Sequence, residues 1–207
     1  VRWVDRVDRS HRCCRFEAVP LHRFLFTILP SSALSAEVDR LKALVHERVG
    51  SFSGRNTVPH ITLCFLDLPA EHEPAINEAI ARGATGQQSF TLGYNGITHF
   101  HDKRTIYIDP VEKDTIASVR TPIVAALMAN EALREAIRET DHPHLTIAAG
   151  LKPAQFERAW ETLAPHLLHP AVSGELRAEE QVTEVVLLRR AIREGERYAH
   201  VRSFALE

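Results

Sequence analysis

A five-residue pattern that occurs twice constrains the fold of this chain more than any other feature. Residues 59–63 read Pro-His-Ile-Thr-Leu, and residues 143–147 read Pro-His-Leu-Thr-Ile. A bare His-x-Thr is expected about once by chance, whereas the full pattern is far rarer. Its apolar and polar residues alternate as in a strand, so the His and Thr of each copy share one face. The copies lie 84 residues apart, which predicts a duplicated α+β unit rather than a tandem repeat array.

The remaining hydrophobic periodicity fits such a duplication. Pro122 lies inside the third expected helix and predicts a break or a first-turn position there. Residues 1–20 are arginine-rich without a clear period, which indicates an extension or a poorly ordered arm. We expect strands at 23–29, 60–66, 89–97, 105–109, 144–148, 172–176, 182–189 and 198–206, and helices at 34–49, 70–84, 113–137 and 153–167.

Charge and composition argue against several classes of protein. The net charge of −2 argues against a protein that coats long nucleic acid by bulk charge. The apolar runs are far shorter than the roughly 20 residues that cross a bilayer, and no signal peptide is recognisable. Cys13, Cys14 and Cys64 do not form a disulfide framework, and Cys64 is interpreted as a small buried hydrophobic residue. A reducing cytoplasm is the expected location.

The residues of the repeated pattern are those that phosphodiester chemistry requires. Cleaving a P–O bond needs a proton removed from the entering oxygen and a proton supplied to the leaving oxygen. Imidazole can do either, because its pKa lies near neutrality. The hydroxyls of Thr62 and Thr146 are candidate donors to the non-bridging oxygens. A pair formed by His60 and His144 therefore predicts acid–base catalysis that requires no metal ion and no cofactor.

The duplicated His-x-Thr, on strands about 80 residues apart, resembles the signature of the 2H phosphoesterase superfamily. This superfamily includes the bacterial RNA 2′,5′-ligase group and the RNA 2′,3′-cyclic phosphodiesterases. The resemblance covers the chain from about His22 onward, so a single bilobal domain is expected over residues 21–207. It implies an α+β fold of two pseudo-symmetric lobes of antiparallel sheet, flanked by helices, with a central cleft between them.

The resemblance also implies a reaction and its residues. The expected activity is hydrolysis or transfer at 2′,3′-cyclic phosphates or 2′,5′-phosphodiesters, with RNA ends or small nucleotides as substrates. His60 and His144 take the catalytic positions, and Thr62 and Thr146 take the phosphate-binding positions. Arg104 opens the strand at 105–109 and is a weaker candidate for gripping a phosphate. Which histidine is the acid stays open, because the two copies are interchangeable in the sequence.

Other interpretations compete with this one. A non-catalytic module that binds RNA ends or nucleotides would keep the same pocket. A metal-dependent hydrolase would draw on further histidines, although no carboxylate or cysteine completes a recognisable ligand set. Phe100 and Tyr107 are expected either to stack on a base or to belong to a sheet core. The further histidines are His99, His101, His142, His166 and His169. A basic turn formed by Arg189, Arg190 and Arg193 is expected either to lie near a nucleotide or, as we prefer, to be a charged hairpin end.

Overall fold

The computed structural model describes residues 19–168, 179–193 and 195–207. Its strands are β1 Leu21–Ile28, β2 Ile61–Pro69, β3 Phe90–Leu92, β4 Tyr94–Phe100, β5 Thr105–Pro110, β6 Ile137–Glu139, β7 Leu145–Ala148, β8 Glu180–Val182, β9 Glu184–Ala191 and β10 Ala199–Ala205. Its helices are α1 Ser32–Val49, α2 Glu73–Ala84, α3 Lys113–Met128, α4 Glu131–Arg134 and α5 Pro153–Leu168, and a short 3-10 turn, Ala70–His72, precedes α2.

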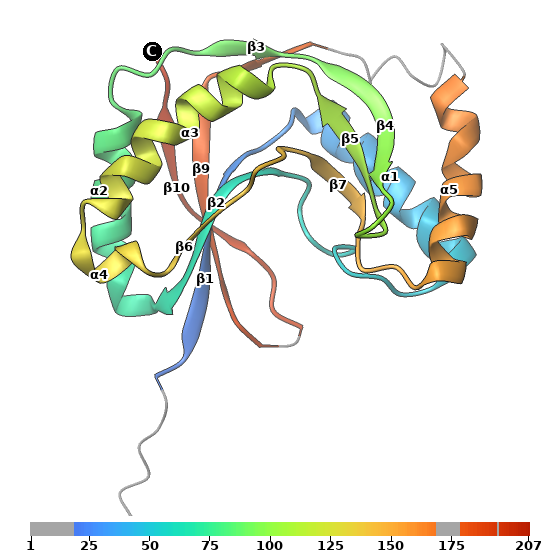
Figure 1. The fold of residues 1–207 in the computed structure, drawn as a ribbon, viewed down its shortest axis with the longest axis horizontal. Helices are drawn as coiled ribbons and strands as arrows, with labels where there is room; N and C mark the ends of the chain where they lie inside the picture. Colours follow the sequence, from blue (N-terminus) through green and yellow to red (C-terminus); the bar gives the residue numbers. More distant parts are fainter. Residues whose placement is uncertain (1–18, 169–178, 194) are drawn as a thin grey trace, which may run out of the picture.

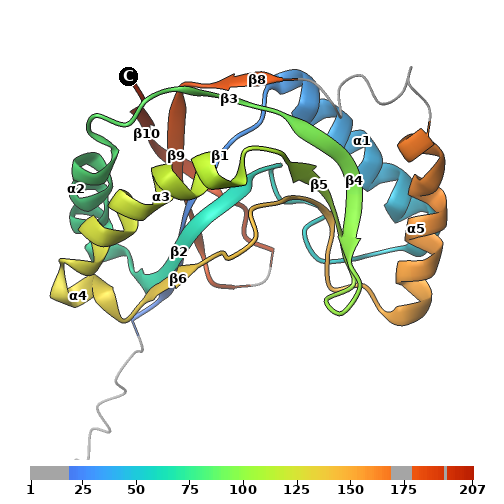
Figure 2. The same ribbon diagram turned by 45° about the horizontal axis from the view of Figure 1, so that its top comes forward.

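The main sheet has eight strands, and every pairing in it is antiparallel. Its order is β10-β9-β1-β2-β7-β5-β4, with β6 beside β2 off this path. Helices flank the sheet in two groups, α2 to α4 at one end and α1 with α5 at the other (Figure 1). Strands β3 and β8 form a separate two-stranded sheet along one edge (Figure 2). The α+β class with a large antiparallel sheet flanked by helices is thus confirmed.

The two lobes exchange elements between the sequence halves. Helix α1 packs against α5 and β7, whereas α3 packs against α2 and β2. Strands β4 and β5 join β7, and β9 with β10 joins β1 and β2. Each Pro-His strand therefore completes a lobe whose other elements come largely from the opposite half of the sequence. Contacts between the two sequence halves therefore bury apolar surface of both, and the single domain over residues 21–207 stays a prediction.

Most expected elements are present, and the differences have local causes. The third expected helix ends at Met128, and Asn130 then caps the short helix α4 by accepting a hydrogen bond from Ala132 N at 3.1 Å. Residues 137–139 form strand β6 rather than the end of that helix. Pro122 lies inside an unbroken α3, because buried residues on both sides of it offset the lost hydrogen bond. The strand expected at 172–176 lies outside the described residues, as do residues 1–18.

A large hydrophobic core is accompanied by a second, smaller cluster of Leu25, Val186 and Leu188. Cys64 belongs to the large core with no exposed surface, and burial raises the pKa of its thiol to about 12, as expected of a small hydrophobic residue. Among the helices of the described ranges, none is both long enough and apolar enough to cross a membrane. The cytoplasmic location stays a prediction.

The contact between α2 and α3 depends on a glycine. A methyl group added at Gly83 would lie 2.4 Å from Ile123 Cα. We expect Gly83→Ala to lower the free energy of unfolding by about 1–3 kcal/mol, because the clash outweighs the roughly 1 kcal/mol that alanine gains in a helix. Urea denaturation measures this, with exposed Arg82→Ala in the same helix as a control expected to stay within about 0.5 kcal/mol. A more stable Gly83→Ala variant would contradict the close packing of the two helices.

Candidate active site

The two repeated segments meet where strands β2 and β7 pair. Ile61 lies opposite Leu145 in antiparallel register, and both side chains are fully buried. Because the strands run in opposite directions, the His of each strand lies beside the Thr of the other. Four half-buried polar side chains therefore gather on the face opposite the core: His60, Thr62, His144 and Thr146.

A β-bulge follows each His-x-Thr at the same position. In the pairing of β2 with β1, the register skips Leu63, directly after Thr62. In the pairing of β7 with β5, it skips Ile147, directly after Thr146. A bulge bends its strand and lets two successive side chains face the same side. The motifs thus keep their polar residues on the open face while the residues that follow return to the core.

Each catalytic candidate is oriented by the backbone two residues before it. His60 Nδ1 lies 2.7 Å from the Val58 carbonyl, and His144 Nδ1 lies 2.7 Å from the His142 carbonyl. A carbonyl only accepts, so Nδ1 donates in both rings and Nε2 is left to exchange a proton. The intervening prolines of the two segments favour the extended conformation in the residue that supplies the carbonyl.

A cation from a helix holds the loop in front of each histidine. Lys42 of α1 donates from Nζ to the Thr57 carbonyl at 2.6 Å, three residues before His60. Arg120 of α3 donates to the Thr140 carbonyl, four residues before His144. Lys42 is only 3% exposed, so water competes little with the hydrogen bond by which it stabilises the loop. In both halves of the site, therefore, a cationic side chain from a helix holds a backbone carbonyl of the loop that precedes the histidine.

The pKa of each histidine is lowered from its ordinary value of 6.5. Burial is the main cause, because it disfavours the charged ring, and the hydrogen bond that each Nδ1 donates opposes it only in part. Charges add to the effect: Lys42 and the other histidine lower the pKa of His60, and Lys103 with His142 lowers that of His144. Both rings are therefore mainly neutral at pH 7, and an anionic phosphate between them would favour a proton on one.

Aromatic side chains lie edge-on to both histidines. The Tyr198 ring lies 6.3 Å from that of His60, measured between centroids. On the other side, Phe100 and Tyr107 stack on each other at 4.3 Å, and each lies 5.3 Å from His144. Phe100 and Tyr107 were expected either to stack on a base or to belong to a sheet core. Tyr107 is buried in the sheet and so belongs to its core, whereas Phe100 is partly exposed.

A cavity of about 500 Å³, here named the inner hollow, opens beside His60. Its wall contains His60 and Thr146, and the other lining residues are Lys42, residues 52–58, Ala149, Arg190 and residues 195–198. Four of these residues are cationic, and the one carboxylate, Glu196, is bonded to Arg193 at 2.6 Å. The inner hollow therefore suits an anionic ligand.

Several of these lining residues were not predicted from the sequence. Lys42 had a detectable signal, since it lies four residues after Val38 and three before Val45, on the buried side of α1. The interpretation of the basic turn as a charged hairpin end fits Arg189, which pairs with Glu73. It also fits Arg193, which pairs with Glu196. Arg190, near the end of β9, lines the inner hollow as well.

Arg104 lies in the turn between β4 and β5 and does not line the inner hollow. Its backbone adopts a left-handed conformation with φ of 47°, and its Nε donates to the Leu151 carbonyl at 2.7 Å. Its phosphate-binding role stays a prediction.

His99 packs against Phe156 and Trp160, with ring centroids 5.3 and 4.6 Å away. In the described part of the chain, no three His, Cys, Asp or Glu residues are grouped so that they could hold a metal ion.

The state of the two rings can be measured without any substrate. We expect NMR titration of His60 and His144 to give midpoints below 6.5 and a neutral form protonated at Nδ1. His60→Gln and His144→Gln assign the signals. Added inorganic phosphate should raise the midpoint of at least one ring. Midpoints at or above 6.5 in the free protein, or an Nε2-protonated form, would contradict the geometry.

Comparisons with known proteins agree with this fold. A family model described as the 2′-5′ RNA ligase superfamily matches residues 29–193. The crystal structure of E. coli LigT in its apo form aligns with a TM-score of 0.59 at 18% identity, covering 90% of this chain and 98% of that one. The protein TT0787 of Thermus thermophilus aligns with a TM-score of 0.64 at 18% identity, covering 89% and 97%. A search of curated proteins finds no match. Because the family model matches most of the chain, the chain belongs to the 2′-5′ RNA ligase superfamily, the 2H phosphoesterases.

Proposed function

We propose that this chain is a metal-independent phosphoesterase in which His60 and His144 form an acid–base pair. Its substrates are 2′,3′-cyclic phosphates or 2′,5′-phosphodiesters, at RNA ends or in small nucleotides. One observation carries the proposal: the pairing of Ile61 with Leu145 sets the two His-x-Thr motifs side by side. In both rings Nδ1 is committed to a backbone carbonyl, which leaves Nε2 as the proton-exchanging atom.

The reaction balances with these two groups alone. In hydrolysis of a cyclic phosphate, the neutral histidine takes a proton from water as the water oxygen bonds to phosphorus. The protonated histidine gives its proton to the ribose oxygen as the P–O bond to that oxygen breaks. The product is a phosphomonoester, and the two rings have exchanged protonation states. A ribose hydroxyl in place of water gives transfer instead, and the same groups serve the reverse direction.

Thr62 and Thr146 are proposed to donate to the non-bridging phosphate oxygens. Their hydroxyls form no hydrogen bond with any residue in the described ranges, so they are available to a ligand. Donors that are positioned before the reaction stabilise the charge that develops on these oxygens. Arg104 is proposed as a supplementary phosphate ligand through its terminal guanidinium nitrogens, since its Nε donates to the Leu151 carbonyl.

The charge of the inner hollow and the ligands of a relative support the same ligand class. The cations of the hollow, Lys42, Arg55, Arg190 and Arg197, provide a field that favours a nucleotide phosphate. E. coli LigT, which shares the fold, has been crystallised with 3′-AMP and with phosphate. Of these two molecules, 3′-AMP is a phosphomonoester, the class of product that the proposed hydrolysis releases, and phosphate is the group that the proposed site would bind.

Substitution of the motif residues tests the proposal. We expect His60→Ala and His144→Ala each to lower kcat by about 10²- to 10⁴-fold, because each removes a proton-transfer group. Thr62→Val and Thr146→Val should each lower it by about 10²-fold, because each removes one donor. The assay uses 2′,3′-cyclic nucleotides and 2′,5′-linked oligonucleotides with and without EDTA, and His200→Ala on the exposed part of β10 is the control.

Different outcomes separate the competing functions. Loss of wild-type turnover in EDTA, together with bound metal in the purified protein, would favour a metal-dependent hydrolase. Tight binding of a 2′- or 3′-phosphorylated nucleotide with no turnover of any substrate would favour a non-catalytic binding module. Full activity of the His60→Ala/His144→Ala double variant would refute the acid–base pair itself.

A further inference from the structure

Lys42 occupies a position on helix α1 where the other side chains are apolar. It lies on the buried face of the helix with Val38, Leu41 and Val45, and only 3% of it is exposed. In the described part of the chain, no other Lys, Arg, Asp or Glu is buried. Burying a cation costs free energy, and an apolar residue of similar size would avoid that cost. A charge that the packing does not require is typical of a residue with a functional role.

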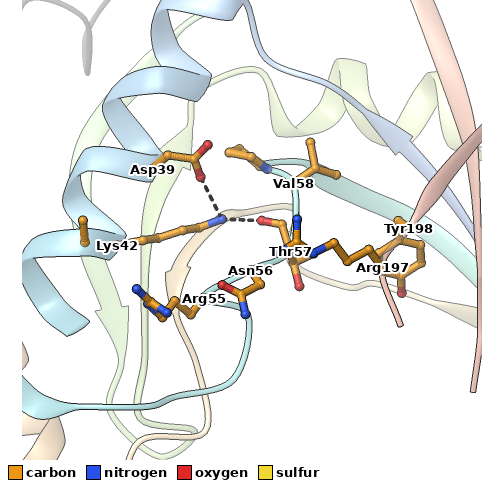
Figure 3. Close-up of a pocket in the computed structure, with 10 residues that line it drawn as sticks. Asp39, Lys42, Arg55, Asn56, Thr57, Val58, Arg197 and Tyr198 are labelled. Atoms are coloured by element: carbon orange, nitrogen blue, oxygen red, sulfur yellow. Dashed lines mark hydrogen bonds and ion pairs between the residues drawn. The ribbon is translucent and has the colours of Figure 1, made fainter. Parts of the chain in front are cut away.

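The Lys42 ammonium has its closest partner, among the described residues, in the loop before His60. Its Nζ donates to the Thr57 carbonyl at 2.6 Å, whereas the Asp39 carboxylate lies 3.6 Å away. Figure 3 shows the side chain extending from α1 toward the loop, with its contacts to Asp39 and Thr57. The Asp39 side chain is 61% exposed, so water screens its attraction for the ammonium. The hydrogen bond to the loop is therefore the main interaction of this buried charge.

The loop before β2 is attached to the rest of the fold at few points. Its backbone is fixed at Ser53, which forms a β-bridge with Ala149, and again at Ile61, where β2 begins. Within the described ranges, the bond from Lys42 is the only hydrogen bond that ties the backbone of residues 54–59 to another element. Loss of this bond would therefore release the segment that leads into the site.

The bond from Lys42 acts on the peptide that leads directly to the histidine. It fixes the orientation of the peptide unit between Thr57 and Val58. The next carbonyl, that of Val58, lies 2.7 Å from His60 Nδ1. Pro59 restricts the preceding residue to the extended region, so the direction of the Val58 carbonyl depends mainly on the peptide that Lys42 holds. A carbonyl that moved away would leave Nδ1 without its acceptor, and the neutral ring would then be protonated at either nitrogen.

We infer that Lys42 is the positioning residue of His60: by holding the Thr57 carbonyl, it commits the imidazole to the Nδ1-protonated tautomer and keeps Nε2 free. Lys42 acts through the loop and takes no part in the proton transfer itself. The catalytic consequence rests on the proposed function, in which Nε2 is the proton-exchanging atom. The tautomer of the free protein does not depend on that function.

Heteronuclear NMR of the free protein tests this inference without any substrate. At about pH 8, where imidazole is mainly neutral, the nitrogen chemical shifts of each ring report which atom carries the proton. Wild type should show His60 protonated at Nδ1. In K42M, which removes the ammonium and fills most of its space, His60 should show a clear Nε2-protonated population while His144 keeps the wild-type tautomer. K42L is measured in parallel as a second apolar variant.

Two further variants locate the effect. R48M removes an exposed cation from the same helix and should leave both rings unchanged. R120M removes the cation that holds the loop before His144, and it should leave the tautomer of His60 unchanged. An Nε2-protonated His60 in R120M would indicate a general loosening of the site and would contradict a specific action of Lys42.

Stability and turnover separate positioning from a merely structural role. Because an apolar side chain removes the cost of a buried charge, K42M should have a urea midpoint equal to or above that of wild type. Its kcat on 2′,3′-cyclic nucleotides should nevertheless fall by about 10- to 100-fold, the size of effect that misplacement of a catalytic group produces. The factor by which kcat falls should exceed the factor by which KM rises.

A His60 ring that stays protonated at Nδ1 in both K42M and K42L would overturn the inference and leave the proposed reaction intact. A urea midpoint well below that of wild type would assign Lys42 a structural role and overturn it too. Weaker binding of inorganic phosphate with an unchanged tautomer would make Lys42 a ligand-binding residue instead. A changed tautomer in K42M, with no turnover of any substrate by wild type, supports the positioning role and refutes the proposed reaction.

Discussion

The pairing of Ile61 with Leu145 is the contact on which the rest of the structure depends. It is the register point at which β2 meets β7, and it joins the two parts of the main sheet. Because both side chains are buried, a shift of one residue in either strand would turn a histidine and a threonine into the core. The core therefore fixes the register, and the register fixes the site. Because each lobe contains elements from both halves of the sequence, we expect that separating β2 from β7 would disturb the packing of both lobes.

The site is built twice from the same local parts. In each copy a proline precedes the histidine, a backbone carbonyl two residues earlier orients its Nδ1, and a bulge follows the threonine. A cation from a helix, Lys42 or Arg120, holds each preceding loop. Because the two copies have the same local surroundings, their geometry does not distinguish the histidine that acts as the acid from the one that acts as the base. The duplication also places two groups of lowered pKa beside each other, so that the charge of the substrate decides which ring is protonated.

Short-range patterns in the sequence predicted the parts of this site, and long-range packing determined what was missed. Alternation in residues 59–63 and 143–147 was enough to predict the shared face of His and Thr. The apolar pair Leu63-Cys64, which interrupts that alternation, was the available signal for the first bulge. The exchange of α1 and α3 between lobes left no local signal, because it depends on contacts between distant segments. Arg55 and Arg197 resemble ordinary surface arginines in sequence, since only the fold brings their loops to the wall of the inner hollow.

The central claim is that two neighbouring histidines of lowered pKa share the proton transfers at one phosphate. The most direct test is the pH dependence of kcat/KM, from about pH 4 to about pH 9 in EDTA, for wild type, His60→Gln and His144→Gln. The account predicts a bell-shaped wild-type profile with its maximum below pH 6.5, since the singly protonated pair is most populated between two lowered values. One variant should lose the acidic limb and the other the alkaline limb, which assigns base and acid. An intact bell in both variants, or a wild-type maximum above pH 6.5, would contradict the account.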